Sequence, residues 1–565
     1  MQSEENPITS QSFADIIVEY QGDRSLLNSF GNVPVTIINE VVALVNIPLQ
    51  QMDNSITSYA YARIPSIGGL VSDNSLEASG IIKIRNVPNF NLRGQGVLIA
   101  VIDTGIEYTN PIFQNADKTT RIVSIWDQTI EGSLPQEGIK YGTVYTKEQI
   151  NTALQSDKPY QVVPSKDDNG HGTMVAGIAG GSESLANNFA GVAPDAEFVI
   201  VKLKQAKNYL RNYYFVPENV FCIQETDFLF ALEYVLGAAS KSHRPLVICV
   251  SNNGSQGAHD GRSVAGRYLS GVASRQGIGI VIAGGNEGNA RRHYYGTVDP
   301  STGYDIVELN VGENEMGFPM EIWGQSPSIL TIDILSPSGE YIPRIIASRN
   351  ESRQISFIFE DTIIDVIYTL VETESGDQLI LLRFSKPAPG IWKFHVYERG
   401  DLQVGFHIWL PMDGFISDNT FFIRSDPYTT ILAVGNTRNP VTVTAYNNED
   451  GSLYLNSSRG YTRLNEIKPN IAAPGVNITG PALDQSFVPY TGTSVAAAHT
   501  TGVVAMLLEW GIVNGNLPGM STVEINKLLM RGAKRETDLL YPNRDWGYGK
   551  LDVFNVFDSL RGETV

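Results

Sequence analysis

The sequence predicts an α/β protein built on a parallel β-sheet with helices on both faces. Three observations lead to this fold class. Continuous apolar runs alternate with helical segments from about residue 75, a pattern typical of strands buried on both faces of a parallel sheet. Between about 297 and 426 the pattern changes to short alternating strands, and after about 427 the first pattern returns. The parallel-sheet unit is therefore expected to contain a β-rich insert.

The elements of the parallel sheet are predicted from runs of small and β-branched residues. The expected strands are 96–105 (GVLIAVIDTG), 197–203 (EFVIVKL), 245–251 (PLVICVS) and 277–285 (GIGIVIAGG). Helices are expected at 225–242, where apolar residues recur at helical spacing, at 494–510 and at 521–535. The polar stretch at about 121–165 is expected to be a surface excursion.

The chain is divided into four predicted segments. Residues 1–66 mix short apolar runs and predict a small α+β module, while 67–296 and 427–565 form the two parts of the parallel-sheet domain. The segment 297–426 holds about seven short strands separated by Gly, Pro, Asn and Asp, which predicts a β-sandwich or jelly roll. These strands are VELNVG, SILTIDILS, RQISFIFED, DVIYTLVET, LILLRFS, IWKFHVYE and VGFHIWLP. We expect this insert to brace the fold, with recruitment of substrate as the alternative.

Composition excludes several classes of protein. The chain has 565 residues and a net charge of −19, which argues against a nucleic acid or an anionic membrane as the main partner, because binding phosphate requires a basic face. Its two cysteines, Cys222 and Cys249, exclude a disulfide framework. The N-terminus has no basic and apolar segments of the signal-peptide kind, and no apolar run reaches 18 residues. We therefore expect synthesis without a secretion signal and no membrane span.

Four residues form a candidate site for acyl transfer by serine. This chemistry requires a nucleophile, a base in contact with it, a carboxylate that orients the base, and donors for the oxyanion. Asp103 ends an apolar strand, His171 lies at a predicted helix start between glycines, and Ser494 opens a helix of small residues. Asn286 follows another buried strand and can donate to the oxyanion together with the N–H of Ser494. The sequence thus predicts Asp103, His171 and Ser494 as a triad and Asn286 as the oxyanion donor.

Four motifs resemble the sequence blocks of the subtilase (subtilisin-like serine protease) family. They are DTGI, HGTMVAGIA, AGGNEG and GTSVAA, and they occur in the family's order Asp, His, Ser. The resemblance implies a subtilisin-like fold, a serine endopeptidase activity, and a substrate-pairing segment at Ser251, Asn252, Asn253 and Gly254. Subtilases usually carry a small apolar stretch after that serine, so the Asn pair leaves the first specificity pocket open. No cofactor and no metal site is expected, since only Glu107 occurs where the family often places a calcium ligand.

The resemblance also implies that residues 1–66 are a prodomain, which acts as a chaperone and inhibitor. We expect the enzyme to cut itself within 60–72, where a strand pairs with Ser251–Asn253, and to retain the cleaved prodomain. A subtilase with a prodomain, a jelly-roll insert and no secretion signal is similar to the Csp germination proteases of clostridial spores. This implies a spore enzyme that activates the precursor of a cortex hydrolase. Two alternatives are a catalytically silent germinant sensor or scaffold and a general intracellular degradative subtilase.

Overall fold

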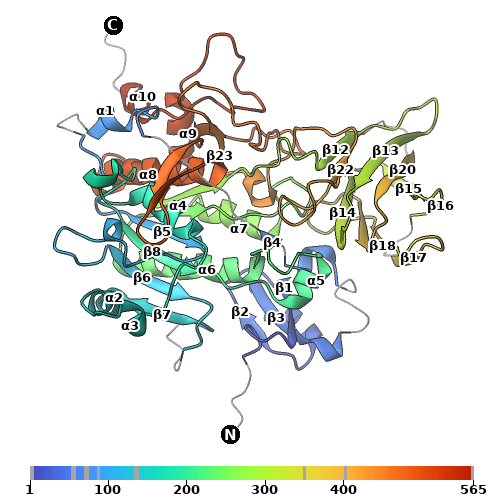
Figure 1. The fold of residues 1–565 in the computed structure, drawn as a ribbon, viewed down its shortest axis with the longest axis horizontal. Coiled ribbons are helices and arrows are strands. Elements are labelled where there is room, and N and C mark those ends of the chain that lie inside the picture. Colours follow the sequence, from blue (N-terminus) through green and yellow to red (C-terminus); the bar gives the residue numbers. More distant parts are fainter. Residues whose placement is uncertain are drawn as a thin grey trace.

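The computed structural model describes residues 6–52, 59–65, 67–68, 76–85, 90–132, 139–347, 352–399 and 404–560. Its centre is an eight-stranded sheet flanked by an N-terminal module and a β-rich insert (Figure 1). All neighbouring strands are parallel except the last pair, β6 and β7. In spatial order the strands are β24 (Ile471–Pro474), β23 (Val441–Tyr446), β11 (Ile278–Ala283), β10 (Leu246–Val250), β5 (Leu98–Asp103), β8 (Glu197–Lys202), β6 (Ile122–Asp127) and β7 (Thr143–Thr146). The predicted α/β fold class is confirmed.

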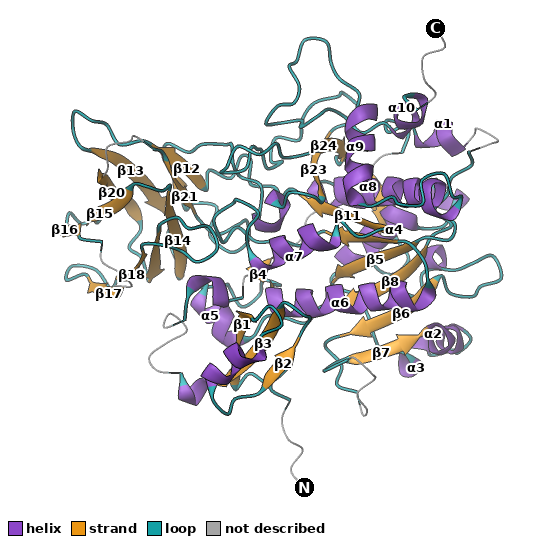
Figure 2. Cartoon of the chain, turned by 180° about the vertical axis from the view of Figure 1, so that it is seen from behind, coloured by secondary structure: helices purple, strands orange, loops and turns teal. Residues whose placement is uncertain are grey.

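Helices cover both faces of this sheet (Figure 2). One apolar core packs the side chains of Ile99 and Val101 with helices α4 (His171–Gly180), α8 (Thr493–Leu508) and α9 (Thr522–Gly532). The opposite core packs Leu98 and Ala100 with α6 (Glu225–Ser242) and α7 (Val264–Val272). Alternate residues of one strand therefore enter different cores, which explains why its sequence is apolar throughout.

The expected surface excursion at 121–165 is wrong in part. Strand β6 lies inside the sheet, and Ile122, Ile125 and Trp126 are buried. The segment is polar on average, but its apolar residues are concentrated in this strand near the sheet's edge, where Ser124 interrupts the apolar run. The part after β7 is peripheral and forms α2 (Lys147–Leu154) and α3 (Pro159–Val162) (Figure 1).

The insert consists of two antiparallel sheets that enclose one apolar core. The first sheet has the order β12 (His293–Gly296), β21 (Phe406–Trp409), β14 (Gly317–Gly324), β19 (Leu379–Ser385), β18 (Ile363–Thr369) and β17 (Ser352–Ser356). The second has the order β16 (Tyr341–Ile345), β15 (Ile329–Leu335), β20 (Gly390–Arg399), β13 (Tyr304–Val311) and β22 (Phe421–Phe422). Strand β14 was not expected because it contains Pro319, which lies beyond the residues that pair with β21. The jelly-roll connectivity and the domain boundaries stay predictions.

The N-terminal module has a three-stranded antiparallel sheet beside the central one. Its strands are β1 (Phe13–Glu19), β3 (Val42–Pro48) and β2 (Val35–Ile37), and a 3₁₀ helix, η1 (Arg24–Phe30), follows β1. The remaining elements are short: η2 (Leu49–Gln51), η4 (Tyr61–Arg63), β4 (Ile67–Gly68), α1 (Ile81–Arg85), η5 (Pro111–Phe113), η6 (Leu185–Asn187), α5 (Asn208–Tyr213), β9 (Ile223–Gln224), η7 (Ala433–Asn436), β25 (Ile478–Pro481), β26 (Phe487–Tyr490), η8 (Glu509–Val513) and α10 (Val553–Asp558).

One helix among the described residues is long and apolar enough to cross a membrane. It runs over Thr493–Val513, and 89% of its most apolar window is buried inside the protein. Burial of this kind is what a core helix of a large sheet shows, and α8 packs against both the sheet and α4.

Candidate active site

The candidate residues gather at the carboxyl edge of the central sheet. Asp103 is the last residue of β5, Ser251 directly follows β10, and Asn286 lies three residues after β11. His171 begins α4, and Ser494 is the second residue of α8. Because parallel strands end at one edge and helices begin there, residues far apart in sequence meet in one place.

Asp103 is the buried centre of the hydrogen-bond network. Both of its carboxylate oxygens lie 2.9 Å from Nδ1 of His171, and the Ser251 hydroxyl and the Thr104 N–H donate to it at 2.6 and 2.7 Å. Burial alone would raise the pKa of Asp103, but His171 and these two donors outweigh it and hold the pKa below its ordinary value. The carboxylate therefore stays ionised and orients His171 through Nδ1, leaving Nε2 as the atom that can act as a base.

Two features explain the local sequence around His171. A Cβ atom on Gly172 would lie 2.2 Å from the carbonyl oxygen of Gly105, so only glycine permits this close approach. The carboxylate of Asp167 accepts hydrogen bonds from the N–H groups of Gly170 and Thr173 at 2.8 and 2.9 Å and thereby orders the start of α4. Sequence reasoning missed Asp167; its signal was an acidic residue just before a helix start.

Ser251 joins the triad residues. Its hydroxyl donates to Asp103, and its carbonyl oxygen accepts from Oγ of Ser494 at 3.0 Å. Ser494 itself is fully buried, at the first turn of α8. The structure thus connects Asp103 with His171 directly and with Ser494 through Ser251, while the catalytic roles of these residues stay predictions.

The side chain of Asn286 is oriented by Thr493. The N–H and hydroxyl of Thr493 donate to Oδ1 of Asn286 at 3.2 and 3.3 Å, and Oγ1 of Thr493 accepts from the N–H of Gly285 at 3.0 Å. Since a backbone N–H can only donate, Oδ1 must face Thr493, and the amide NH₂ of Asn286 is left as a donor. A donor next to the nucleophile is what an oxyanion requires.

The predicted substrate-pairing segment lies beside the triad, but its two asparagines brace it. Nδ2 of Asn252 donates to the carbonyl of Ile102 at 2.7 Å. Oδ1 of Asn253 accepts from the N–H groups of Gly254 and Val434 at 2.9 and 3.2 Å. These contacts fix the segment against β5 and η7, so the Asn pair has a structural role.

The strand of the predicted self-processing window pairs elsewhere than expected. Ile67 and Gly68 of β4 pair antiparallel with Gln224 and Ile223 of β9, whereas the sequence predicts that this strand pairs with Ser251–Asn253. β9 was not expected because a two-residue strand at the start of a helix leaves no periodic signal. Residues 66 and 69–72 of the window lie outside the described residues.

The part of the chain that the structure describes contains no candidate metal site. No group of three or more His, Cys, Asp or Glu side chains there is arranged to hold a metal ion. Glu107 instead accepts hydrogen bonds from the N–H groups of Asp484 and Gln485 at 2.9 and 3.2 Å.

Comparison with known proteins identifies the family. The model of the subtilase family matches residues 94–307 and 424–549, which leaves out most of the insert. The chain belongs to the subtilase family. This confirms the resemblance found in the sequence, and the chain carries a subtilase peptidase domain.

Individual relatives agree with this membership. The solved structure of the Clostridium perfringens CspB protease is 29% identical with a TM-score of 0.77, covering 86% of this chain and 98% of that chain. The C5a peptidase of Streptococcus pyogenes serotype M1 is 24% identical over 454 residues, which are 74% of this chain and 34% of that protein. Bacillopeptidase F of Bacillus subtilis (strain 168) is 32% identical over 108 residues, 18% of this chain and 7% of that protein. The chain spans about a third or less of the length of these two curated relatives.

Proposed function

We propose that this subtilase is an active serine endopeptidase that cuts its own N-terminal segment within 60–72 and retains the module 1–66. In this proposal Nε2 of His171 takes the proton of Ser494 as its Oγ attacks the peptide carbonyl. Asp103 stabilises the imidazolium that forms, and the Asn286 amide and the Ser494 N–H donate to the oxyanion. His171 then returns the proton to the leaving amine, and a water molecule, deprotonated by His171, breaks the acyl bond to Ser494 and restores its hydroxyl. The observation that carries this proposal is the connected network from Asp103 through Ser251 to Ser494.

Self-processing is supported by the antiparallel pairing of β4 with β9. This pairing tethers the window next to α6, within the same molecule as Ser494. An intramolecular reaction of this kind has a high effective concentration, so cleavage should be fast.

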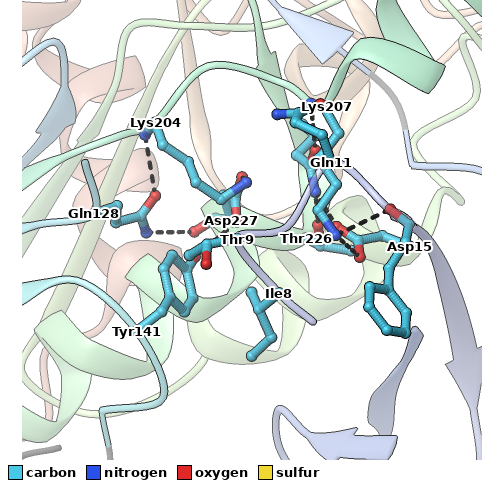
Figure 3. A network of polar contacts seen from close by, with 12 residues as sticks. Ile8, Thr9, Gln11, Asp15, Gln128, Tyr141, Lys204, Lys207, Thr226 and Asp227 are labelled. Carbon is cyan, nitrogen blue, oxygen red and sulfur yellow. Dashed lines mark hydrogen bonds and ion pairs between the residues drawn. The ribbon is translucent and has the colours of Figure 1, made fainter. Parts of the chain in front are cut away.

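Retention of the module is supported by a buried polar network at its contact with the subtilase domain (Figure 3). Nζ of Lys207 lies 2.7 Å from Oδ1 of Asp15 in β1, and it donates to the carbonyl oxygen of Pro7 at 2.8 Å. The side chain of Gln224 also donates to Asp15. Both Lys207 and Asp15 are fully buried, so departure of the cut module would leave Lys207 without its counter-charge.

The proposed substrate is a cortex-hydrolase precursor, cleaved at limited sites during spore germination. The likeness to the Clostridium perfringens CspB protease over 98% of that chain supports this choice, together with the resemblance to Csp germination proteases. The segment 1–66 and the insert 297–426 are proposed to be a prodomain and a jelly-roll brace.

The test compares purified wild-type protein with Ser494→Ala. Wild-type protein should yield two fragments, one of roughly 65 residues, that co-purify and separate on denaturation, because cutting is intramolecular. Ser494→Ala should stay one chain, since loss of a triad residue costs about 10⁴–10⁶ in kcat in subtilisin, with the serine at the upper end. N-terminal sequencing locates the cut, and a fluorophosphonate probe reports Ser494.

Three results would redirect the proposal. Equal cutting of Ser494→Ala would contradict cis processing by this triad. Wild-type protein that is uncut and unlabelled by the probe would favour the silent scaffold. Broad cleavage of denatured casein would favour the general degradative enzyme over limited processing.

A further inference from the structure

The loop that carries Asn286 is held from the subtilase domain on one side. This loop, 284–288, accepts a hydrogen bond at the carbonyl of Gly285 from the Ser458 N–H at 2.8 Å. In return the Glu287 N–H donates to Oγ of Ser458 at 2.9 Å. Gly285 has a φ of +104°, and a Cβ there would lie 2.5 Å from Cγ of Leu432, so the loop is packed tightly on this side.

The other side of the loop is held by the side chain of Glu287. Glu287 directly follows Asn286, is 6% exposed, and its Oε1 accepts from the Asp413 N–H at 3.1 Å. Its Oε2 lies 3.4 Å from Nη1 of Arg292, which is 4% exposed. Arg292 also reaches the carboxylates of Asp413 and Asp418 at 3.1 and 2.9 Å, both in the segment between β21 and β22. The oxyanion loop is thus tied to the end of the insert by two buried charges.

Arg292 is the group on which the buried state of Glu287 depends. Burial raises the pKa of Glu287, and the guanidinium of Arg292 opposes this rise. The side chains of Asp413 and Asp418 are 66% and 88% exposed, so water can replace Arg292 for them. Glu287 has no such alternative. Without Arg292 it must take up a proton or move toward solvent, and either change displaces the residue next to Asn286.

We infer that Arg292 is a positioning residue for catalysis: through Glu287 it holds the loop that presents the Asn286 amide to the oxyanion. The inference rests on the proposed oxyanion role of Asn286. It gives the insert a task in turnover, because the partners of Arg292 and Glu287 at 413–418 belong to the predicted segment 297–426.

The experiment measures kcat and KM on a peptide ester for wild type, Arg292→Met, and Arg292→Met/Glu287→Gln. The single variant should lose about 10–10² in kcat with KM changed less than about threefold, since the affected donor acts mainly in the transition state. The double variant should recover most of the loss, because Gln needs no counter-charge and can still accept from the Asp413 N–H. Arg291→Met is the matched control: Arg291 donates to the carbonyls of Phe422 and Ile423 in the insert and should leave kcat within about twofold.

A pH profile separates positioning from general loosening. Without Arg292, Glu287 can stay in place only while protonated, so kcat of Arg292→Met relative to wild type should fall as pH rises through the pKa of Glu287. The double variant has no carboxyl at 287 and should follow the wild-type profile.

Several outcomes overturn the inference. They are an unchanged kcat in Arg292→Met, an equal loss in Arg291→Met, or a double variant as slow as the single. If Arg292→Met does not fold, the double variant decides: recovery of folding and turnover supports the inference, and continued failure overturns it. Asn286→Ala serves as the reference. If it leaves kcat unchanged, the proposed oxyanion role itself fails, whereas a loss in Asn286→Ala with none in Arg292→Met removes only the role of Arg292.

Discussion

The N-terminal module and the insert both pack beside the central sheet, and one contact of each differs in its chemistry (Figure 1). The N-terminal module places the carboxylate of Asp15 against Lys207 in a contact where both side chains are fully buried. The insert meets the subtilase domain through stacked rings as well as through the charges of Glu287 and Arg292. The ring of His259 lies 4.1 Å from that of Trp409 in β21, with an interplanar angle of 7°.

The ring stack continues into the insert. His293 and His407 each stack on Trp409, with centroids 5.0 and 5.1 Å away, and Nε2 of His293 lies 2.8 Å from Nδ1 of His407. Nδ1 of His293 faces the carbonyl of Asp426 at 3.1 Å, so it carries the proton, and His407 donates to His293. This tautomer assignment satisfies both rings while they are neutral.

The two contacts are expected to be weakened by different changes. A buried ion pair is strongly destabilised when one partner is lost, which suits a module that is expected to stay after its peptide link is cut. A stack of neutral histidines is robust near neutral pH and fails when the rings take up protons. The following substitutions test this contrast, from the largest expected effect to the smallest.

Lys207→Met should have the largest effect. Removing one partner of a buried pair costs about 3–5 kcal/mol, because Asp15 is left with an uncompensated charge. Urea unfolding of the uncut Ser494→Ala chain measures this cost. In the cut protein, size exclusion should show that the N-terminal fragment separates from the rest.

The control for this prediction is Lys241→Met, an exposed lysine on α6. Adding Asp15→Leu to Lys207→Met should recover part of the stability, since it removes the orphan charge. If Lys207→Met lowers the free energy of unfolding by less than about 1 kcal/mol, the Lys207–Asp15 pair contributes no more than an exposed ion pair, which would contradict the prediction.

Acid should weaken the insert joint. Burial lowers the pKa of His259 to about 4 and that of His293 to about 3, below the ordinary value of about 6.5. Because these folded-state values are depressed, the unfolded chain binds protons first. The free energy of unfolding should therefore fall as pH drops below about 6.5, by about 1.4 kcal/mol per pH unit for each histidine.

The measurement is urea unfolding at pH 7, 6 and 5 for wild type and His293→Gln. In His293→Gln the free energy of unfolding should fall less steeply with decreasing pH, by about 1.4 kcal/mol per pH unit, because one histidine is missing. His395→Gln is the matched control, because His395 lies in the insert but outside the stack, where its Nδ1 contacts Asp333 at 2.7 Å. Equal slopes in wild type and His293→Gln would contradict the role of the stack.

Arg267→Met should have the smallest effect, although Arg267 touches both modules. Its guanidinium contacts Glu19 in β1 and Glu374 in the insert, the latter at 3.0 Å, but its side chain is 40% exposed. Burial raises the pKa of Glu374 to about 8, so this carboxyl is mostly protonated at neutral pH. A cost of at most about 1 kcal/mol is expected in urea unfolding. A cost as large as that of Lys207→Met would show that contact with both modules, and not burial of the charges, determines how much such an ion pair stabilises the protein.

Much of the fold follows from local patterns in the sequence. The continuous apolar strands around 98–103 and 278–283 and the helix at 225–242 appear where hydrophobic periodicity places them. The family is also predictable, since DTGI, HGTMVAGIA, AGGNEG and GTSVAA require only local motifs in order. Strands β6 and β14 were missed because the first lies near a sheet edge and the second carries Pro319, so neither shows an uninterrupted apolar run.

The sequence by itself determined the fold class, the family and the residues expected in the triad, because each depends on neighbours a few positions away. Only the tertiary structure decided which distant side chains meet. It joined His259 to Trp409, Asp15 to Lys207 and Glu287 to Arg292. Glu287 and Arg292 are only five residues apart, but their side chains are held together by contacts with Asp413 and Asp418 of the insert. Such pairs depend on how separate layers of the molecule pack. The hydrophobic periodicity of a sequence indicates helices and strands but not which side chains meet between layers.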